Sequence, residues 1–300
     1  MPQPAAFAVA RFAGAEAAMA LLAKETRWRE GVVSPRFDGA VIAPGASCVS
    51  RSGFLLRTES GLDIHYRRGE GVTVARGGGV AAGEEALWLA GSVRAAIAAI
   101  CGLLPLHASA VAHEGRVYAF AGASGTGKST LVAALARAGL AVYADDTLLL
   151  DLGDPARLVC LPGHKRLKLA DDVLALTGAR GEEGVGAGIA KRYARPAQGA
   201  PPPPRHPLEL AAICFIEEGG AVAVKPIGGG EAIARLGEDH YTQRFFTAVA
   251  GLDRAGLFAL RARIARQARM TCLTRPRALD RLADSVACVV QALRADGALQ

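Results

Sequence analysis

The sequence Val117-Tyr-Ala-Phe-Ala-Gly-Ala-Ser-Gly-Thr-Gly-Lys-Ser-Thr130 decides the fold of this chain. It contains the spacing G-x-x-x-x-G-K-S/T, which is that of a phosphate-binding loop. In such a loop the glycines let backbone N–H groups point at phosphate oxygens. Lys128 then faces the β- and γ-phosphates, and Ser129 offers a hydroxyl to Mg²⁺. The sequence therefore predicts a nucleotide site formed by Gly122, Ala123, Ser124, Gly125, Thr126, Gly127, Lys128, Ser129 and Thr130.

The segments on either side of this phosphate loop fit the strand–loop–helix frame that it requires. Residues 117–121 are apolar and are expected to form a strand, whereas residues 129–138 carry apolar side chains at helical spacing. Gly139 suits the end of that helix. An ordinary glycine-rich turn is the alternative interpretation, and these flanks disfavour it.

Length, composition and charge limit the class of protein. The 300 residues are 51% hydrophobic and 21% charged, which allows a large core and excludes disorder across the whole chain. The formal net charge of +7 suits an anionic ligand. The basic residues are scattered with few aromatic residues among them, so we expect no nucleic-acid partner. The six cysteines lack any C-x-x-C or metal-ligand spacing, which is typical of a reducing compartment.

The sequence predicts neither a signal peptide nor a membrane span. Arg11, Glu16 and Lys24 interrupt the alanine-rich N-terminal stretch, which is unlike a secretory signal. The apolar run near residues 95–106 contains Pro105 and is too short to cross a bilayer. We therefore expect a cytoplasmic protein with no membrane partner.

The chain is expected to divide into two units, residues 1–103 and 104–300. The first would be a small β-rich unit with short strands between residues 38 and 82 and flanking helices over 12–27 and 84–103. The second would be an α/β unit built around the phosphate loop. Its other expected elements are strands at 108–112, 140–144, 147–152, 158–161, 209–216 and 221–226, a helix over 168–177, and a mostly helical stretch over 230–296.

Residues 178–207 are rich in glycine and proline and contain a basic run. Long loops inside a compact domain are often functional. We expect this segment to be a mobile lid, or a loop that docks an acceptor through Lys191, Arg192 and Arg195. A solvated connector is the alternative.

Asp145 and Asp146 follow the expected buried strand at 140–144. The carboxyl ends of strands surround the ligand in α/β sheets, so both carboxylates should lie beside the phosphate loop. One could hold Mg²⁺ and the other accept a proton from an attacking hydroxyl. An aspartate pair that caps a turn is the alternative. His107 precedes the strand at 108–112, and a histidine in such a place is on its own more often a core residue than a site residue.

The run from His107 to Asp146 resembles the catalytic core of bacterial HPr kinase/phosphorylase, and it looks most like the HPr kinase-related tailoring kinases of ribosomal (lasso-type) peptides. The matching segments are Leu106-His107, Gly122-Ala-Ser-Gly-Thr-Gly-Lys-Ser129 and Ala144-Asp145-Asp146. The resemblance implies an α/β P-loop kinase core of the HPr kinase C-terminal/PEP carboxykinase-like type, preceded by a small β-rich unit, with ATP and Mg²⁺ as cofactors.

The resemblance also implies roles by position. Asp146 would be the general base, His107 would place or neutralise the phosphates, and Lys128 would be the catalytic cation. Ser129 and Asp145 would hold the metal. The family's later Glu-Ile-Arg-Gly-like segment, which supplies a second metal carboxylate, has no counterpart here. Asp171 or Asp172 is the candidate to replace it, and the reverse phosphorylase activity is not expected.

The favoured hypothesis is a kinase that transfers the γ-phosphoryl group of ATP to a hydroxyl, expected to be serine, of a peptide or small protein. Two alternatives stay open: a small-molecule kinase similar to shikimate or gluconate kinases, and a regulatory P-loop ATPase. A GTPase is disfavoured because the chain contains no asparagine for a guanine-binding N-K-x-D motif. The hexamers of the family allow a homo-oligomer but assign no interface residue.

Overall fold

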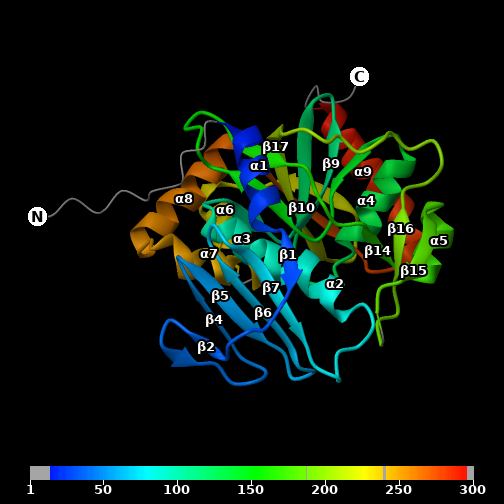
Figure 1. Cartoon of the computed structure of the whole chain (residues 1–300). Coiled ribbons are helices and arrows are strands. Elements are labelled where there is room, and N and C mark those ends of the chain that lie inside the picture. Colours follow the sequence, from blue (N-terminus) through cyan, green and yellow to red (C-terminus); the bar gives the residue numbers. More distant parts are fainter. Residues whose placement is uncertain (1–13, 187, 239–240, 296–300) are drawn as a thin grey trace, which may run out of the picture.

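The computed structural model describes residues 14–186, 188–238 and 241–295 (Figure 1). The N-terminal part contains helix α1 (Ala15–Glu25) and a sheet in the order β1-β7-β6-β5-β4. In β6 the buried side chains alternate with half-buried ones, so Leu62, Ile64 and Tyr66 share one fully buried face. The strands are β1 (Trp28–Glu30), β4 (Ser47–Ser50), β5 (Gly53–Arg57), β6 (Leu62–Arg67) and β7 (Gly71–Arg76), with a separate pair β2 (Arg36–Phe37) and β3 (Ala40–Val41). The short strands expected between residues 38 and 82 are thus present.

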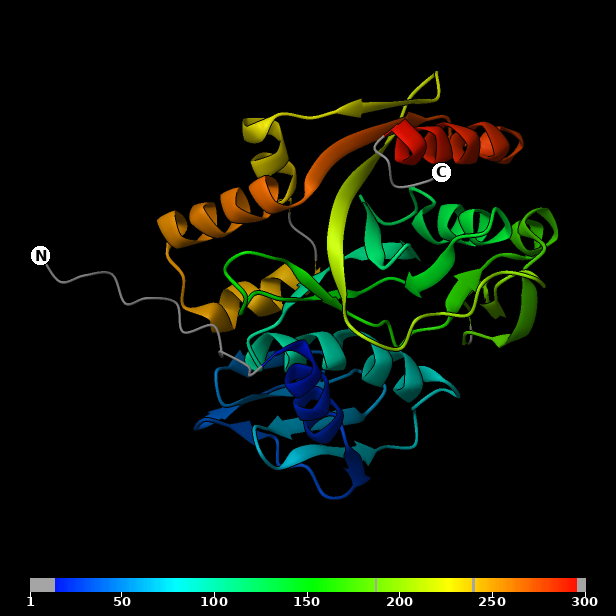
Figure 2. The same cartoon turned by 90° about the horizontal axis from the view of Figure 1, so that it is seen from above.

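The single helix expected over residues 84–103 is broken into three parts. They are α2 (Glu84–Trp88), the π-helical segment η1 (Leu89–Val93) and α3 (Arg94–Ile100). The break lies at Gly91, whose backbone is not helical (φ −95°, ψ −110°). Helix α3 lies between the N-terminal sheet and the rest of the molecule (Figure 2), and residues 95–100 are all buried. One apolar cluster runs from this sheet through α3 into the second sheet, so the division at residue 103 stays a prediction.

The larger sheet has the order β11-β9-β10-β17-β13-β12-β8, and β19 pairs with both β17 and β18. Strand β10 is parallel to β17, and β17 is parallel to β19. Both β10 and β11 are antiparallel to β9, so β11 runs in the same direction as β10. The strands are β8 (Leu104–Leu106), β9 (Ala108–His113), β10 (Arg116–Ala121), β11 (Ala141–Ala144), β12 (Leu148–Asp151), β13 (Val159–Leu161), β17 (Leu208–Glu218), β18 (Ala223–Pro226) and β19 (Arg269–Arg275).

Both faces of this sheet are buried. In β17, Ile213 and Phe215 belong to the cluster that also holds Phe246 of α7, whereas Cys214 and Ile216 belong to the cluster that holds Leu131 of α4. Helices therefore cover the sheet on two sides, as Figure 1 shows. They are α4 (Lys128–Arg137), α5 (Asp171–Thr177), α6 (Gly229–Arg235), α7 (Tyr241–Ala250), α8 (Arg254–Gln267), η2 (Leu279–Arg281) and α9 (Leu282–Ala295). None of the helices in the described ranges is long and apolar enough to cross a bilayer.

Two expectations need correction and a third is incomplete. The stretch 230–296 is mostly helical, as expected, but it also contains the buried strand β19. The helix expected over 168–177 begins later, at Asp171, because β14 (Leu167–Leu169) occupies the residues before it. Within 178–207, β15 (Arg180–Gly184) and β16 (Arg192–Arg195) form a small sheet in the order β14-β16-β15, so this segment is not simply a loop.

Candidate active site

Strands β10, β11, β17 and β19 of the larger sheet run in one direction, and their carboxyl ends meet at one edge. Strand β10 leads into the phosphate loop, and β11 leads into Asp145 and Asp146. Strand β9 runs the opposite way, so its start lies at the same edge and brings His107 and Ser109 there. The order of the strands therefore explains why residues far apart in the sequence gather around the loop.

The phosphate loop depends on backbone conformations that favour glycine. Gly122, Gly125 and Gly127 all have positive φ (147°, 86° and 87°). A Cβ atom on Gly122 would lie 2.9 Å from the carbonyl oxygen of Ile216 in β17. The loop thus passes too close to the neighbouring strand for a side chain at this position.

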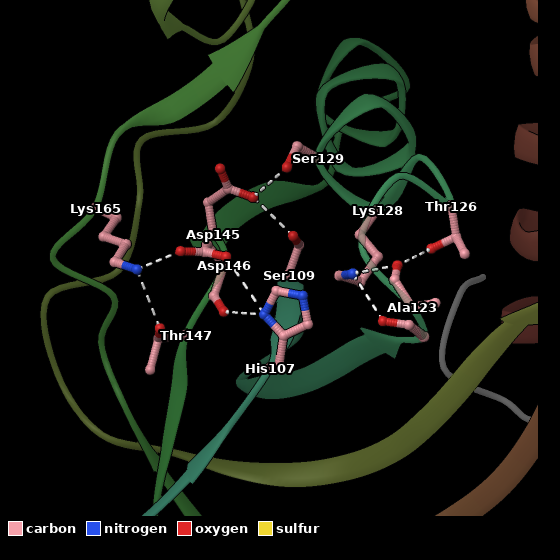
Figure 3. Close-up of polar contacts among 11 residues, drawn as sticks. His107, Ser109, Ala123, Thr126, Lys128, Ser129, Asp145, Asp146, Thr147 and Lys165 are labelled. Carbon is pink, nitrogen blue, oxygen red and sulfur yellow. Dashed lines mark hydrogen bonds and ion pairs between the residues drawn. The ribbon is translucent and has the colours of Figure 1, made fainter. Parts of the chain in front are cut away.

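Lys128 lies inside the curve of the loop. Its Nζ donates hydrogen bonds to the carbonyl oxygens of Gly122 (2.8 Å) and Ala123 (2.9 Å), as Figure 3 shows. Burial lowers the pKa of Lys128 to about 8, although the carboxylates of Asp146 and Asp145 act in the opposite direction. The ammonium is therefore held where bound phosphates would meet it, and phosphate charge would restore its ordinary pKa.

Asp145 is fully buried and joins two serine hydroxyls. Its Oδ1 accepts hydrogen bonds from Ser109 Oγ and Ser129 Oγ, both at 2.7 Å. Burial raises the pKa of Asp145, and the two serine hydrogen bonds oppose that rise. The carboxylate is thus fixed beside the hydroxyl that a phosphate loop normally offers to a metal.

The oxygen atoms of Ser129 and Asp145 fit Mg²⁺ by their chemistry. Mg²⁺ is usually held by one or two carboxylates together with substrate phosphates, not by a cage of protein ligands. The described residues contain no group of three His, Cys, Asp or Glu side chains able to hold a metal. Asp171 and Asp172 stay the predicted candidates for a second metal carboxylate. They lie in the first turn of α5.

Asp146 faces a different environment from its neighbour. Its backbone has φ of 64°, a conformation that few residues other than glycine adopt. His107 Nδ1 lies 3.3 Å from Oδ1 of Asp146 and 3.0 Å from its carbonyl oxygen, and Lys165 Nζ contacts Oδ2 (Figure 3). Burial alone would raise the pKa of Asp146, but His107 and Lys165 outweigh it and hold that pKa below its ordinary value. Asp146 is therefore a carboxylate at neutral pH.

The sequence did not identify two of these partners. Lys165 precedes β14 and also donates to Thr147 Oγ1 (3.2 Å), so it holds the turn after β11 as well as Asp146. Ser109 follows His107 by two residues, but nothing in the pattern singles out its hydroxyl. A lysine within a basic run is normally solvent-exposed, whereas the Lys165 side chain is 3% exposed, and only the fold reveals its partner.

Of the three cations expected in the 178–207 segment, Lys191 is the one whose charge acts on lysines beside the phosphate loop. Burial lowers the pKa of Lys168, and the charges of Lys165 and Lys191 act in the same direction. The charge of Lys191 also helps to lower the pKa of Lys128. Arg195 instead pairs with Glu182 inside the small sheet (2.5 Å). The structure thus distinguishes Lys191, whose charge acts on Lys128, from Arg195, which links β16 to β15.

Comparisons with known proteins add little to this geometry. Neither a protein-family model nor a curated protein sequence matches the chain. Among solved structures, the HPr(Ser) kinase/phosphatase from Coxiella burnetii is similar with a TM-score of 0.30 and 11% identity, over 64% of this chain and 98% of that chain. A likeness this distant assigns no activity. What the structure itself establishes is an α/β fold with the phosphate loop and two aspartates at one edge of the sheet.

Proposed function

We propose that the protein is a kinase that transfers the γ-phosphoryl group of ATP to a hydroxyl, expected to be a serine of a peptide or small protein. The observation that carries the proposal is that two adjacent carboxylates have different partners. Asp145 is tied to the phosphate-loop hydroxyl of Ser129, whereas Asp146 is tied to His107 and Lys165. Neighbouring carboxylates in different surroundings are suited to different roles.

The first role is metal binding. Ser129 and Asp145 would hold Mg²⁺ together with phosphate oxygens of the nucleotide, and the metal would neutralise charge on the β- and γ-phosphates. Lys128 would bind the same phosphates from within the loop, and the N-terminus of α4 would add backbone N–H groups. These groups mainly position the nucleotide, which is most of what phosphoryl transfer requires.

The second role is that of a base. The carboxylate of Asp146 would accept a hydrogen bond from the acceptor hydroxyl and take its proton as the new O–P bond forms and the bond to ADP breaks. Because its pKa is low, Asp146 is a weak base. It therefore orients the hydroxyl first and receives the proton late, when bonding to phosphorus has made that proton acidic. His107 and Lys165 hold the carboxylate in position and balance its charge.

The test is transfer of radiolabel from the γ-position of ATP in the presence of Mg²⁺. Wild type would be incubated with a library of serine-containing peptides and, separately, with hydroxylated metabolites. The matched variants are Asp146→Asn and Asp280→Asn, the second removing an exposed aspartate of η2. Label on a peptide serine that disappears only in Asp146→Asn supports the proposal. Label on a metabolite alone, or release of free phosphate alone, overturns it in favour of a small-molecule kinase or an ATPase.

A further inference from the structure

Strand β19 ends at a buried cation that the proposed chemistry has not used. Arg275 is 4% exposed. Its Nε donates weakly to the carbonyl oxygen of Pro276 (3.4 Å), and its Nη1 is buried without a hydrogen-bond partner in the described part of the chain. Burial also lowers the pKa of Arg275. A buried guanidinium without an anionic partner among the described residues is costly, so its presence favours a ligand anion.

The guanidinium of Arg275 lies directly against the phosphate loop. A Cβ atom on Gly127 would lie 3.5 Å from its Nη2 and 3.8 Å from its Nη1. Arg275 also lines a cavity of about 210 Å³ whose wall on one side is residues 123–126 of the loop. The unpartnered cation and the loop that is built for phosphate therefore border the same space.

The acidic residues of this cavity are not directed at Arg275. Glu217 pairs with Arg235 (2.6 Å), and Glu218 lies 3.9 Å from Arg277. Arg277 itself donates to the carbonyl oxygen of Gly125 (3.2 Å). The carboxylates that could neutralise Arg275 are thus engaged by other arginines, and a ligand anion is the remaining candidate.

The strand order gives the cavity its place relative to the reaction. Asp145 and Asp146 follow β11, which lies on one side of the loop strand β10, whereas β17 and β19 lie on the other. The γ-phosphate must face the two aspartates if transfer occurs there. The nucleoside end must then leave the loop toward β17 and β19, where this cavity lies.

We propose that Arg275 binds the nucleotide: its guanidinium donates to phosphate oxygens on the nucleoside side of the loop, and the cavity beside it receives the nucleoside end of a nucleoside di- or triphosphate. This inference rests on the proposed function. It assigns a second phosphate-binding cation, which reaches the phosphates from the opposite side to Asp145. It also gives the missed strand β19 a direct part in the site.

The experiment is titration calorimetry of ADP with Mg²⁺ against wild type, Arg275→Met, Arg275→Lys and the control Arg281→Met, which removes an exposed arginine of η2. Hydrogen bonds to charged groups are worth enough that Arg275→Met should weaken ADP affinity by roughly 10- to 100-fold. Arg275→Lys keeps the charge and should recover part of that loss. The control should bind ADP as wild type does.

Thermal unfolding distinguishes ligand binding from a structural role. Removing a buried charge without a partner should leave the melting temperature without nucleotide unchanged or higher, while the increase caused by ADP shrinks. A Met variant that melts earlier or does not fold assigns Arg275 to structure and overturns the inference. So does a well-folded Met variant that binds ADP as tightly as wild type, and in that case the proposed function stands. A wild type that binds no ADP overturns both.

Discussion

Ser129 and Asp145 are joined by a hydrogen bond of 2.7 Å that links the first turn of α4 to the end of β11. In the sheet only β9 lies between β11 and β10, the strand that leads into the loop, and Ser109 of β9 donates to the same carboxylate oxygen. The phosphate loop is therefore anchored to the strand that supplies both aspartates. Any movement of the loop relative to β11 would break this buried contact.

Exchanging the two aspartates for asparagine should separate their roles. Asp146→Asn should bind Mg²⁺–ATP normally but lower kcat by about 10²–10⁴, since a base acts on the transition state and hardly on the bound substrate. Asp145→Asn should instead weaken Mg²⁺–ATP binding by roughly 10- to 100-fold, the scale of a hydrogen bond to a charged group. Calorimetry and single-turnover transfer measure the two effects. The reverse pattern would make Asp145 the better candidate for the base.

The ion pair of Lys165 with Asp146 predicts a pH effect. The ammonium helps to keep the pKa of Asp146 low, so Lys165→Met should raise that pKa. Because the proposed base acts in its carboxylate form, the acid limb of the kcat/KM profile should move to higher pH in this variant. Lys225→Met, which removes an exposed lysine of β18, is the control. Identical acid limbs in Lys165→Met and wild type would show that Asp146 does not limit the rate.

His164 predicts how stability depends on pH. Its Nε2 contacts the carbonyl oxygen of Ala90 (2.7 Å), and burial, with Arg94 second, lowers its pKa from 6.5 to about 3. Between these values the unfolded chain binds a proton that the folded chain does not. This contribution to stability is therefore complete above pH 6.5 and is lost as the pH falls toward 3. The melting temperature should decline over this window in wild type.

The matching variant is His164→Gln, which retains a hydrogen-bond donor but does not titrate. Its melting temperature should decline less between pH 6.5 and 4 than that of wild type, whereas the exposed His206→Gln should follow wild type. Parallel curves for His164→Gln and wild type would mean that other groups cause the acid sensitivity.

Within the 178–207 segment, substitutions of Lys191 and Arg195 should have different effects on KM. If the segment docks the acceptor, Lys191→Ala should raise the KM for the acceptor at low salt; if it covers the nucleotide, the KM for ATP should rise instead. The expected increase is roughly two- to fivefold, which corresponds to the loss of one exposed ion pair. The difference from wild type should shrink as salt rises. Arg195→Ala breaks the ion pair with Glu182 but should leave this KM unchanged. If the Lys191 variant and wild type had equal kinetics at low salt, the segment would be a connector without a role in binding.

The core of the site was predictable from the sequence because it lies in one short stretch. Residues 107–146 contain the start of β9, the phosphate loop and the end of β11, and all three come to the same edge through two antiparallel pairings. When the parts of a motif are joined by short connections, the sequence alone constrains their relative positions. For that reason His107, Lys128 and Asp146 could be placed together before the fold was known.

The rest of the site was not predictable because distant segments supply it. Lys165 arrives after β13, and no periodicity pairs one lysine with one aspartate. Strand β19 lies alone between the helices α8 and α9, so it was not distinguished from the helical stretch around it. The antiparallel pair of β15 and β16 was not predicted, because backbone pairing can hold strands whose side chains show no clear alternation.

The central position of β17 has a consequence for how this protein is made. Strand β10 pairs with β9, only a few residues away, but its other edge pairs with β17, which lies about ninety residues later in the chain. During synthesis that apolar edge stays unpaired until residues 208–218 have emerged. Long-range pairing of this kind slows folding and exposes strand edges to other chains. We therefore expect the nascent chain to depend on chaperones until β17 has emerged and paired with β10.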